Sequence, residues 1–143
     1  MPFFIALETE IEKAEIAGKS VIIEMDANSK LGNKYIPSDP HKISPNGLLL
    51  AGIIERHALV VANGDKRSEG VITRKRVTRD RVEESAIDIV LFSLDMMPYF
   101  VSLKVDEGRK HVLTRITKTK NGVNTKKSDH NVLQAEFNSE VCE

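Results

Sequence analysis

Three short polar segments carry the residues of this chain that are best suited to chemistry. They are Asp26-Ala27-Asn28, Ser85-Ala86-Ile87-Asp88 and Ser128-Asp129-His130. Each lies beside an apolar, strand-like run, so its polar groups are expected at the rim of a sheet. Carboxylates, a carboxamide and a histidine at one rim can orient water, a metal ion or a phosphate.

Asp26 and Asn28 form the first candidate pair. A carboxylate at a strand end can accept a proton from water, and a carboxamide two residues later can hold water or a phosphate oxygen. The same two residues also suit an ordinary polar turn that ends the strand. The first segment alone leaves both interpretations open.

Asp88 lies in an apolar run that continues to Phe92. A carboxylate that is buried without a partner is costly, so this position predicts a partner for Asp88. The alternative is that Asp88 faces solvent on a half-exposed strand.

Ser128, Asp129 and His130 do not suit a Ser-His-Asp hydrolase triad. Consecutive residues of an extended chain point to alternate sides and cannot line up a nucleophile, a base and an orienting group. Alone, the segment also fits a loop that ends in a histidine. The other histidines, His41, His57 and His111, have no second His or Cys at metal-ligand spacing, which disfavours zinc. Carboxylates and a carboxamide favour Mg²⁺ or Mn²⁺.

In this order the three segments resemble the motifs of the C-terminal half of the endonuclease/exonuclease/phosphatase superfamily. The first family motif is Gly-Asp-x-Asn, and Met25 stands here at the glycine position. The resemblance implies a single α/β (α+β) domain over residues 1–143. Its fold would be half of a four-layer α/β sandwich, with a mixed, mainly antiparallel sheet and helices on one face. The family's N-terminal half, which bears the principal metal-ligating glutamate, is not expected before Asp26.

The resemblance also implies a role for each residue. Asp26 would activate the attacking water and Asn28 would orient it. Asp88 would accept a hydrogen bond from His130, whose other ring nitrogen would face the scissile phosphate. Asp129 would assist Mg²⁺ or Mn²⁺, bound weakly or not at all by half a site. Ser85 and Ser128 would have supporting roles.

A closer resemblance, to the endonuclease domains of non-LTR retrotransposon reverse transcriptases, is carried by residues 46–50, residues 59–63, Thr73 and the closing Ser-Asp-His-Asn. In those domains the hairpin before the Ser-x-Ile-Asp strand lies against target DNA. Here it would carry five basic residues, Arg74, Lys75, Arg76, Arg79 and Arg81. Phosphate contact suits this cluster, and so does an ordinary solvated hairpin.

The chain has no overall charge, because 21 Lys and Arg residues balance 21 Asp and Glu residues. Nucleic acid, with DNA as the first expectation, would therefore be bound by local clusters. A second basic stretch holds Lys118, Lys120, Lys126 and Lys127.

The single cysteine, Cys142, excludes an intramolecular disulfide and favours a reducing compartment. No apolar run approaches the ~18 residues that span a bilayer, so we expect a soluble intracellular protein without a membrane partner, in nucleus or cytoplasm.

Periodicity and turn residues predict the elements that position these segments. Apolar spacing predicts a helix over 3–17 that stops at Gly18, and another from Pro45 with Leu49, Ile53, Ile54 and His57 on one face. Strands are expected at 20–24, 59–61, 101–105 and 132–137, a loop at 29–45, and a helical turn at 94–100. A hairpin is expected between 71–77 and 87–92, joined by a charged turn at 78–84.

Three functions compete at this stage. The first is a metal-dependent phosphodiesterase of endonuclease type that acts on nucleic acid. The second is a non-catalytic fragment or nucleic-acid-binding relic of such an enzyme, and the third is a phosphomonoesterase of the same superfamily. The resemblance further implies an uncovered apolar sheet face, bearing Ile23, Val61, Ile89 or their alternates, which a two-fold homodimer would cover.

Overall fold

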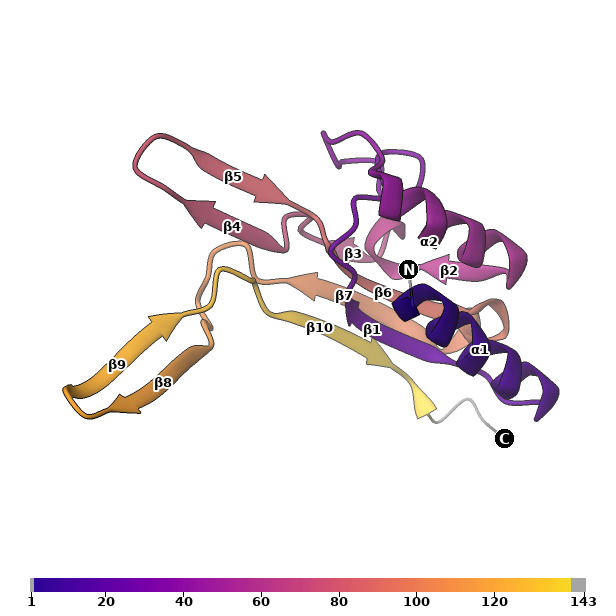
Figure 1. The fold of residues 1–143 in the computed structure, drawn as a ribbon. Helices are drawn as coiled ribbons and strands as arrows, with labels where there is room; N and C mark the ends of the chain where they lie inside the picture. Colours follow the sequence, from indigo (N-terminus) through magenta and orange to yellow (C-terminus); the bar gives the residue numbers. More distant parts are fainter. Residues whose placement is uncertain (1, 140–143) are drawn as a thin grey trace.

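Two α-helices cover one face of a three-stranded sheet (Figure 1). In the computed structural model, which describes residues 2–139, the helices are α1 (Pro2–Ile16) and α2 (Pro45–Arg56). The central sheet has the antiparallel order β1 (Ile22–Asp26), β6 (Asp88–Ser93), β2 (Leu59–Val61). The fold is α+β, as the sequence predicts, and the helices lie on one face of the central sheet.

A second three-stranded sheet packs on the other face of the central sheet. It has the order β10 (Leu133–Phe137), β7 (Phe100–Val105), β3 (Ser68–Glu69), and only its β3–β7 pair is parallel. Phe92 of β6 lies among the rings of Phe100 and Phe137, with centroids 5.0 and 5.5 Å away. These apolar contacts make a separate core between the two sheets.

The alternation of β6 explains why both of its faces are buried. Ile89 and Leu91 pack toward the helices, whereas Val90 and Phe92 pack toward the second sheet. Ile23 and Val61 also pack in the helix-side core. The expectation of an uncovered face at Ile23, Val61, Ile89 or their alternates is therefore wrong, because the chain's own helices and second sheet cover both sides. The homodimer inferred from that face loses its physical basis.

Two hairpins extend from one end of the molecule (Figure 1). The first pairs β4 (Arg74–Val77) with β5 (Val82–Ser85), and the second pairs β8 (Thr114–Thr119) with β9 (Gly122–Lys127). The predicted hairpin of 71–77 with 87–92 is wrong, because the last three residues of its charged turn, 82–84, belong to strand β5, which pairs with β4. The apolar residues after Ser85 enter the centre of the central sheet instead, where burial favours them.

Most of the remaining predicted elements are confirmed within a few residues. Helix α1 ends before Gly18, whose φ of +67° suits a residue without a side chain. Residues Leu94–Tyr99 form the 3-10 helix η2, and Ala62–Gly64 form η1. On α2 the predicted apolar face is partly wrong, because Leu50 is buried and Leu49 is 37 % exposed. Cys142 lies outside the described residues, and no helix within residues 2–139 is long and apolar enough to cross a bilayer.

His57 fastens α1 to the end of α2. Its Nδ1 lies 2.6 Å from Glu15 Oε1 and its Nε2 lies 2.8 Å from Glu8 Oε2, while its side chain is only 9 % exposed. Burial alone lowers the pKa of His57, but the hydrogen bonds to Glu15 and Glu8 and their charges outweigh burial and raise this pKa above its ordinary value. The doubly bonded imidazolium therefore stabilises the packing of α1.

We expect this contact to make stability depend on pH. Because the folded chain holds the His57 proton more tightly, the stabilisation is complete below the ordinary pKa of about 6.5 and is lost as pH rises through the raised folded-state pKa. Thermal unfolding of the wild type should thus show a lower midpoint at pH 9 than at pH 6, and His57→Gln should reduce that difference. His111→Gln, at an exposed histidine outside this contact, is the control. An unchanged difference in His57→Gln would contradict the assignment.

Candidate functional site

Asp26, Asp88 and His130 meet at one end of the central sheet. Asp26 ends β1 and Asp88 begins β6, and the two residues are direct antiparallel partners. His130 Nδ1 lies 2.8 Å from Asp88 Oδ2, and its Nε2 lies 3.8 Å from Asp26 Oδ2. The predicted hydrogen bond between Asp88 and His130 is confirmed. Two carboxylates directly opposite each other repel, so the imidazole between them offsets that repulsion.

The backbone of Asp88 is held by two buried polar side chains. Thr73 is fully buried, and its hydroxyl oxygen accepts hydrogen bonds from the N–H groups of Ile87 (2.9 Å) and Asp88 (3.0 Å). Asn63, just after β2, donates from Nδ2 to the Asp88 carbonyl and accepts from the Val90 N–H through Oδ1. These contacts replace ladder hydrogen bonds where β6 begins, and they leave the Asp88 side chain to face His130.

The segment that carries His130 lies alongside the first residues of β4. The Lys75 N–H donates to the Asp129 carbonyl (2.8 Å), and the Asn131 N–H donates to the Thr73 carbonyl (2.6 Å). Asn131 also accepts from Arg109 Nη1 at 2.9 Å through its side chain, while Arg109 Nη2 donates to the Ser128 carbonyl. This bonding holds His130 toward Asp88.

Asp129 faces the same ring nitrogen as Asp26 but has a cationic partner. Its Oδ1 lies 3.7 Å from His130 Nε2, and its Oδ2 accepts a 2.9 Å hydrogen bond from Arg74 Nε. Partial burial raises the pKa of the Asp129 carboxyl, but the hydrogen bond and charge of Arg74, with the charge of His130, outweigh burial and lower it. Asp129 is therefore held as a carboxylate.

The pKa of Asp88 is displaced in the opposite direction. Burial raises it most, and the charge of Asp26 adds to the rise, while the hydrogen bond to His130 opposes both. A carboxyl with a raised pKa beside a carboxylate with a lowered one is the kind of contrast found where enzymes move protons.

Asn28 and Met25 show how the first segment is built. Asn28 adopts the left-handed conformation with φ +44°, and its N–H donates to Asp26 Oδ1 at 3.1 Å. Met25 lies in the regular part of β1 opposite Ile89 and packs against the helix-side core. This strand position therefore accepts a side chain, and the backbone turn that requires an unusual φ comes later, at Asn28.

The supporting serines have different positions. Ser128 accepts the His130 N–H through its hydroxyl at 3.1 Å, so it shapes the backbone before the histidine. Ser85 lies opposite Arg74 in the first hairpin, and its carbonyl accepts the Thr73 N–H at 3.0 Å. Both residues lie beside the site.

The predicted basic cluster is less uniformly positive than its sequence indicates. Arg74 pairs with Asp129, Lys75 with Glu84 at 3.5 Å, and Arg81 with Glu83 at 2.5 Å. Within the described residues, Arg76 and Arg79 have no ion pair. The cluster thus splits into three paired cations and two unpaired ones.

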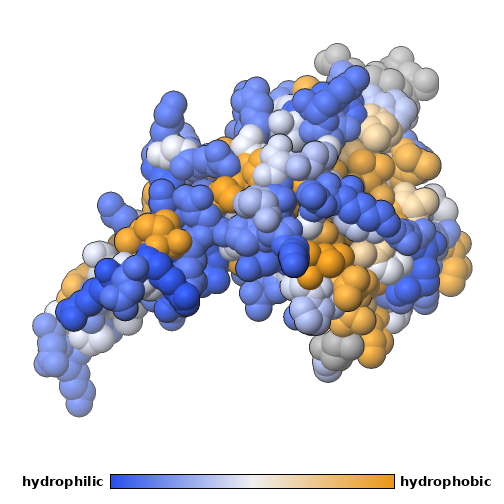
Figure 2. All heavy atoms as spheres, turned by 90° about the horizontal axis from the view of Figure 1, so that it is seen from above, coloured by the Kyte–Doolittle hydropathy of each residue, from blue (hydrophilic) through white to orange (hydrophobic). Residues whose placement is uncertain are grey.

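A basic groove runs between the two hairpins and reaches Asp129. It has a volume of about 790 Å³, and its cationic lining residues are Arg74, Lys75, Arg76, Arg115, Lys126 and Lys127. Figure 2 shows this end of the molecule, on the left, as a predominantly hydrophilic surface. The second basic stretch of the sequence contributes through Lys126 and Lys127, so strands far apart in sequence build one surface.

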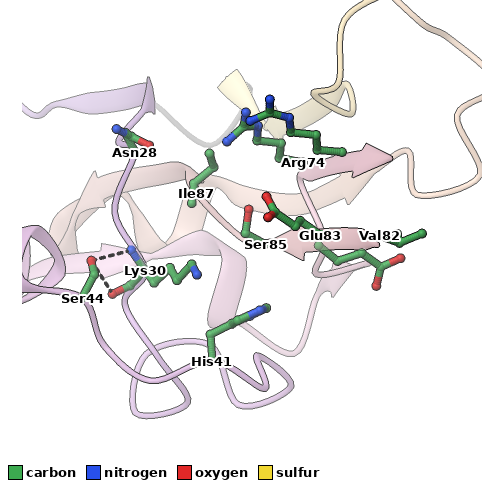
Figure 3. Close-up of a pocket in the computed structure, with 11 residues that line it drawn as sticks. Asn28, Lys30, His41, Ser44, Arg74, Val82, Glu83, Ser85 and Ile87 are labelled. Atoms are coloured by element: carbon green, nitrogen blue, oxygen red, sulfur yellow. Dashed lines mark hydrogen bonds between the residues drawn. The ribbon is translucent and has the colours of Figure 1, made fainter. Parts of the chain in front are cut away.

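A second cleft of about 540 Å³ opens beside the first hairpin (Figure 3). Asn28, Lys30 and His41 line one side of it, and Arg74, Arg76 and Ser85 line the other. Because the Asn28 N–H donates to Asp26 and Arg74 donates to Asp129, this cleft lies next to the Asp26–His130 site.

Sequence reasoning missed several residues that build the site. Asn63, Arg109 and Asn131 were assigned no role, although their side chains fix its backbone. The position of Asn131 directly after His130 could have indicated its role. Asn63 and Arg109 have long-range partners, which leave no local pattern in the sequence.

Comparisons of the chain with protein-family models, with curated proteins and with solved structures found no match.

Proposed function

We propose that this protein binds the phosphodiester backbone of nucleic acid, with DNA as the first candidate, and hydrolyses it at the Asp26–His130 site. One observation carries the proposal: a histidine whose Nδ1 is bonded to Asp88 at 2.8 Å and whose Nε2 faces Asp26 and Asp129 at 3.8 and 3.7 Å. This arrangement supports the proposed relationship to the endonuclease/exonuclease/phosphatase superfamily.

Each side chain has a definite role in the proposed reaction. Asp88 accepts from Nδ1 of the protonated His130 ring, whose Nε2–H can then donate to a phosphate oxygen as negative charge develops. The Asp26 side chain is 56 % exposed and accepts a proton from the attacking water, while the Asn28 amide orients that water. Arg74 keeps Asp129 ionised beside the departing group.

The donor set suits a hard divalent cation such as Mg²⁺ or Mn²⁺. Asp88 Oδ2 is engaged by His130, and Asp26 is assigned to the attacking water, which leaves Asp129 Oδ1 as the carboxylate oxygen that would hold the ion. Mg²⁺ is commonly bound through one or two carboxylates, with water and substrate phosphate completing its shell. When bound, the ion would supply Lewis-acid stabilisation of the phosphate.

The shape and charge of the surroundings favour a polymeric phosphate. The basic groove leads away from Asp129 between two hairpins and offers cations over a length that one phosphomonoester would not use. We therefore place a nucleic-acid strand before an inositol phosphate among the candidate substrates.

Binding without catalysis is the second candidate, and the Arg74–Asp129 ion pair favours it. Because Arg74 already neutralises one oxygen of Asp129, the carboxylate is a weaker ligand for a cation. In that case the same surface would hold nucleic acid while metal-dependent cleavage would be lacking.

Nicking of a supercoiled plasmid separates the two candidates. The proposed activity predicts relaxed circles in Mg²⁺ and none when EDTA replaces it. Retention of the plasmid on the protein without nicking, in either Mg²⁺ or Mn²⁺, would support binding alone. A protein that neither retains the plasmid nor nicks it would refute the proposal.

We expect the unpaired arginines of the first hairpin to govern affinity. Replacing Arg76 and Arg79 by Ala should weaken DNA binding and reduce the slope of log affinity against log salt by about one for each phosphate that the variant no longer neutralises. Arg81→Ala is the matched control, because its guanidinium is paired with Glu83. Fluorescence anisotropy at several salt concentrations measures both quantities. Equal slopes in the wild type and the double variant would show that this hairpin is an ordinary solvated surface.

A further inference from the structure

His41 is held by a buried carboxylate on the wall of the second cleft. The Asp39 side chain is fully buried, and its Oδ1 accepts hydrogen bonds from the His41 N–H (3.0 Å) and from His41 Nδ1 (2.9 Å). Its other oxygen, Oδ2, is also buried and has no hydrogen-bond partner among the described residues. Donation from Nδ1 to Asp39 leaves Nε2 as the free nitrogen of the ring.

The burial of the Asp39 carboxylate in a loop destabilises the folded state. A buried carboxylate with one oxygen unbonded costs stability, and in the described structure its only charge-capable partner is the His41 ring. A carboxylate that orients one imidazole nitrogen sets the other for a ligand, as second-layer carboxylates do around functional histidines. The His41 side chain is 29 % exposed and lines the cleft, so a ligand can reach it.

The same cleft has an excess of available positive charge. The side chains of Lys30 and Arg76 line it and form no ion pair within the described residues. Its two carboxylates, Glu83 and Glu84, are paired with Arg81 and Lys75, which are not among the lining residues. An anion would therefore be attracted to this space.

The chain around Lys30 is held rigidly against the start of α2. The Ser44 hydroxyl accepts the N–H groups of Lys30 (3.0 Å) and Gly47 (3.1 Å). Figure 3 shows the contact with Lys30 at the cleft wall. A Cβ at Gly47 would lie 2.0 Å from the Lys30 carbonyl oxygen, so glycine permits this close approach. A preorganised wall loses little entropy when it binds a ligand.

We propose that His41, positioned by Asp39, forms with Lys30 and Arg76 a second phosphate subsite, which binds the nucleic-acid backbone next to the Asp26–His130 site. This inference rests on the proposed function and names where a neighbouring phosphate of the same strand lies. In its protonated form the ring can donate one N–H group to Asp39 and the other to the phosphate.

Two thymidine probes test the subsite: hexathymidylate, and the thymidine dinucleoside monophosphate, which has a single phosphate. Their affinities are measured by fluorescence anisotropy and competition, with Ca²⁺ in place of Mg²⁺. His41→Gln should lower affinity for hexathymidylate about fivefold, the scale of one charge-assisted contact, and leave that for the dinucleoside monophosphate unchanged. Asp39→Asn should act in the same direction as His41→Gln, because His41 loses its orienting carboxylate. His111→Gln is the control. Equal losses for the two probes would overturn a second subsite.

Imidazole ¹⁵N spectra of the wild type separate this inference from the proposed function. They do not depend on the folding of any variant. Addition of hexathymidylate should shift the ring signals of both His41 and His130. A shift of His130 alone would overturn the subsite and leave the proposed function standing, whereas no shift of either would overturn both. A shift of His41 without His130 would support an anion subsite and count against the proposed reaction.

Discussion

Replacing His130 by alanine is expected to reduce Mg²⁺-dependent nicking at least about a hundredfold, because the donor that stabilises transition-state charge is removed. Asp88→Asn should cost nearly as much. An asparagine keeps the size of the side chain but has no negative charge to bond the imidazolium, the form of the ring that donates from both nitrogens. The two residues act as one unit, so the double variant should be little worse than His130→Ala.

Plasmid nicking rates of the two single variants and the double variant test this unit directly. His111→Ala is the matched control, because His111 is outside the site and exposed. A loss below tenfold in His130→Ala, or losses that multiply in the double variant, would contradict the assigned pair.

The stability of Asp88→Asn distinguishes a functional loss from unfolding. Burial raises the pKa of Asp88, so the folded state favours the protonated carboxyl more than the unfolded chain does. The stabilisation from this group is therefore complete below the ordinary Asp pKa and is lost as pH rises through the raised folded-state value. At pH 7 the neutral asparagine should raise the thermal midpoint, and at low pH the two proteins should converge. A variant less stable at pH 7 would contradict this sign.

The joining of Asp88 to His130 was predictable from sequence because both lie at the ends of apolar runs in an order that resembles a known family. The partner of Asp129 was not predictable. Arg74 is 55 positions away in the sequence and belongs to a cluster for which the sequence suggested phosphate contact or an ordinary solvated hairpin. Local patterns describe which face a residue occupies, but they do not assign one charge to another across the fold.

The misplaced hairpin has a similar cause. Residues 82–84 of strand β5 include Glu83 and Glu84 and were interpreted as part of a turn. The exposed strands of a projecting hairpin need no apolar alternation, so the sequence gives no strand signal there. The cross-strand ion pair of Glu84 with Lys75 takes the place of apolar packing there, and Glu83 lies opposite Arg76 in the ladder. The β8–β9 hairpin was missed for the same reason, although its Asn121-Gly122 dipeptide is a hairpin signal.

His41 shows the limit of judging histidines by spacing. Its loop is rich in proline and lacks a second metal-ligand residue at the expected interval, so sequence reasoning gave it little weight. The burial of Asp39 two residues earlier changes that judgement. Burial in this loop depends on long-range packing, because its Leu31 and Ile36 lie in one core with residues of α2.

Thr73→Val is expected to lower the free energy of unfolding by about 2–4 kcal/mol, because it leaves two backbone N–H groups, of Ile87 and Asp88, without their acceptor in the interior. Valine has nearly the same shape, so packing changes little and the loss reports the missing hydroxyl. Thr117→Val, on the exposed strand β8, is the matched control and should change stability by no more than about 0.5 kcal/mol.

Urea unfolding followed by circular dichroism measures the change, with equal slopes against denaturant required for the comparison. We expect the Thr73→Val variant to lose nicking activity as well, since the start of β6 carries Asp88 toward His130. A loss of less than about 1 kcal/mol would show that water or a shifted backbone satisfies both N–H groups. In that case Asn63, which holds the same strand from the β2 side, would be the residue that determines where Asp88 lies.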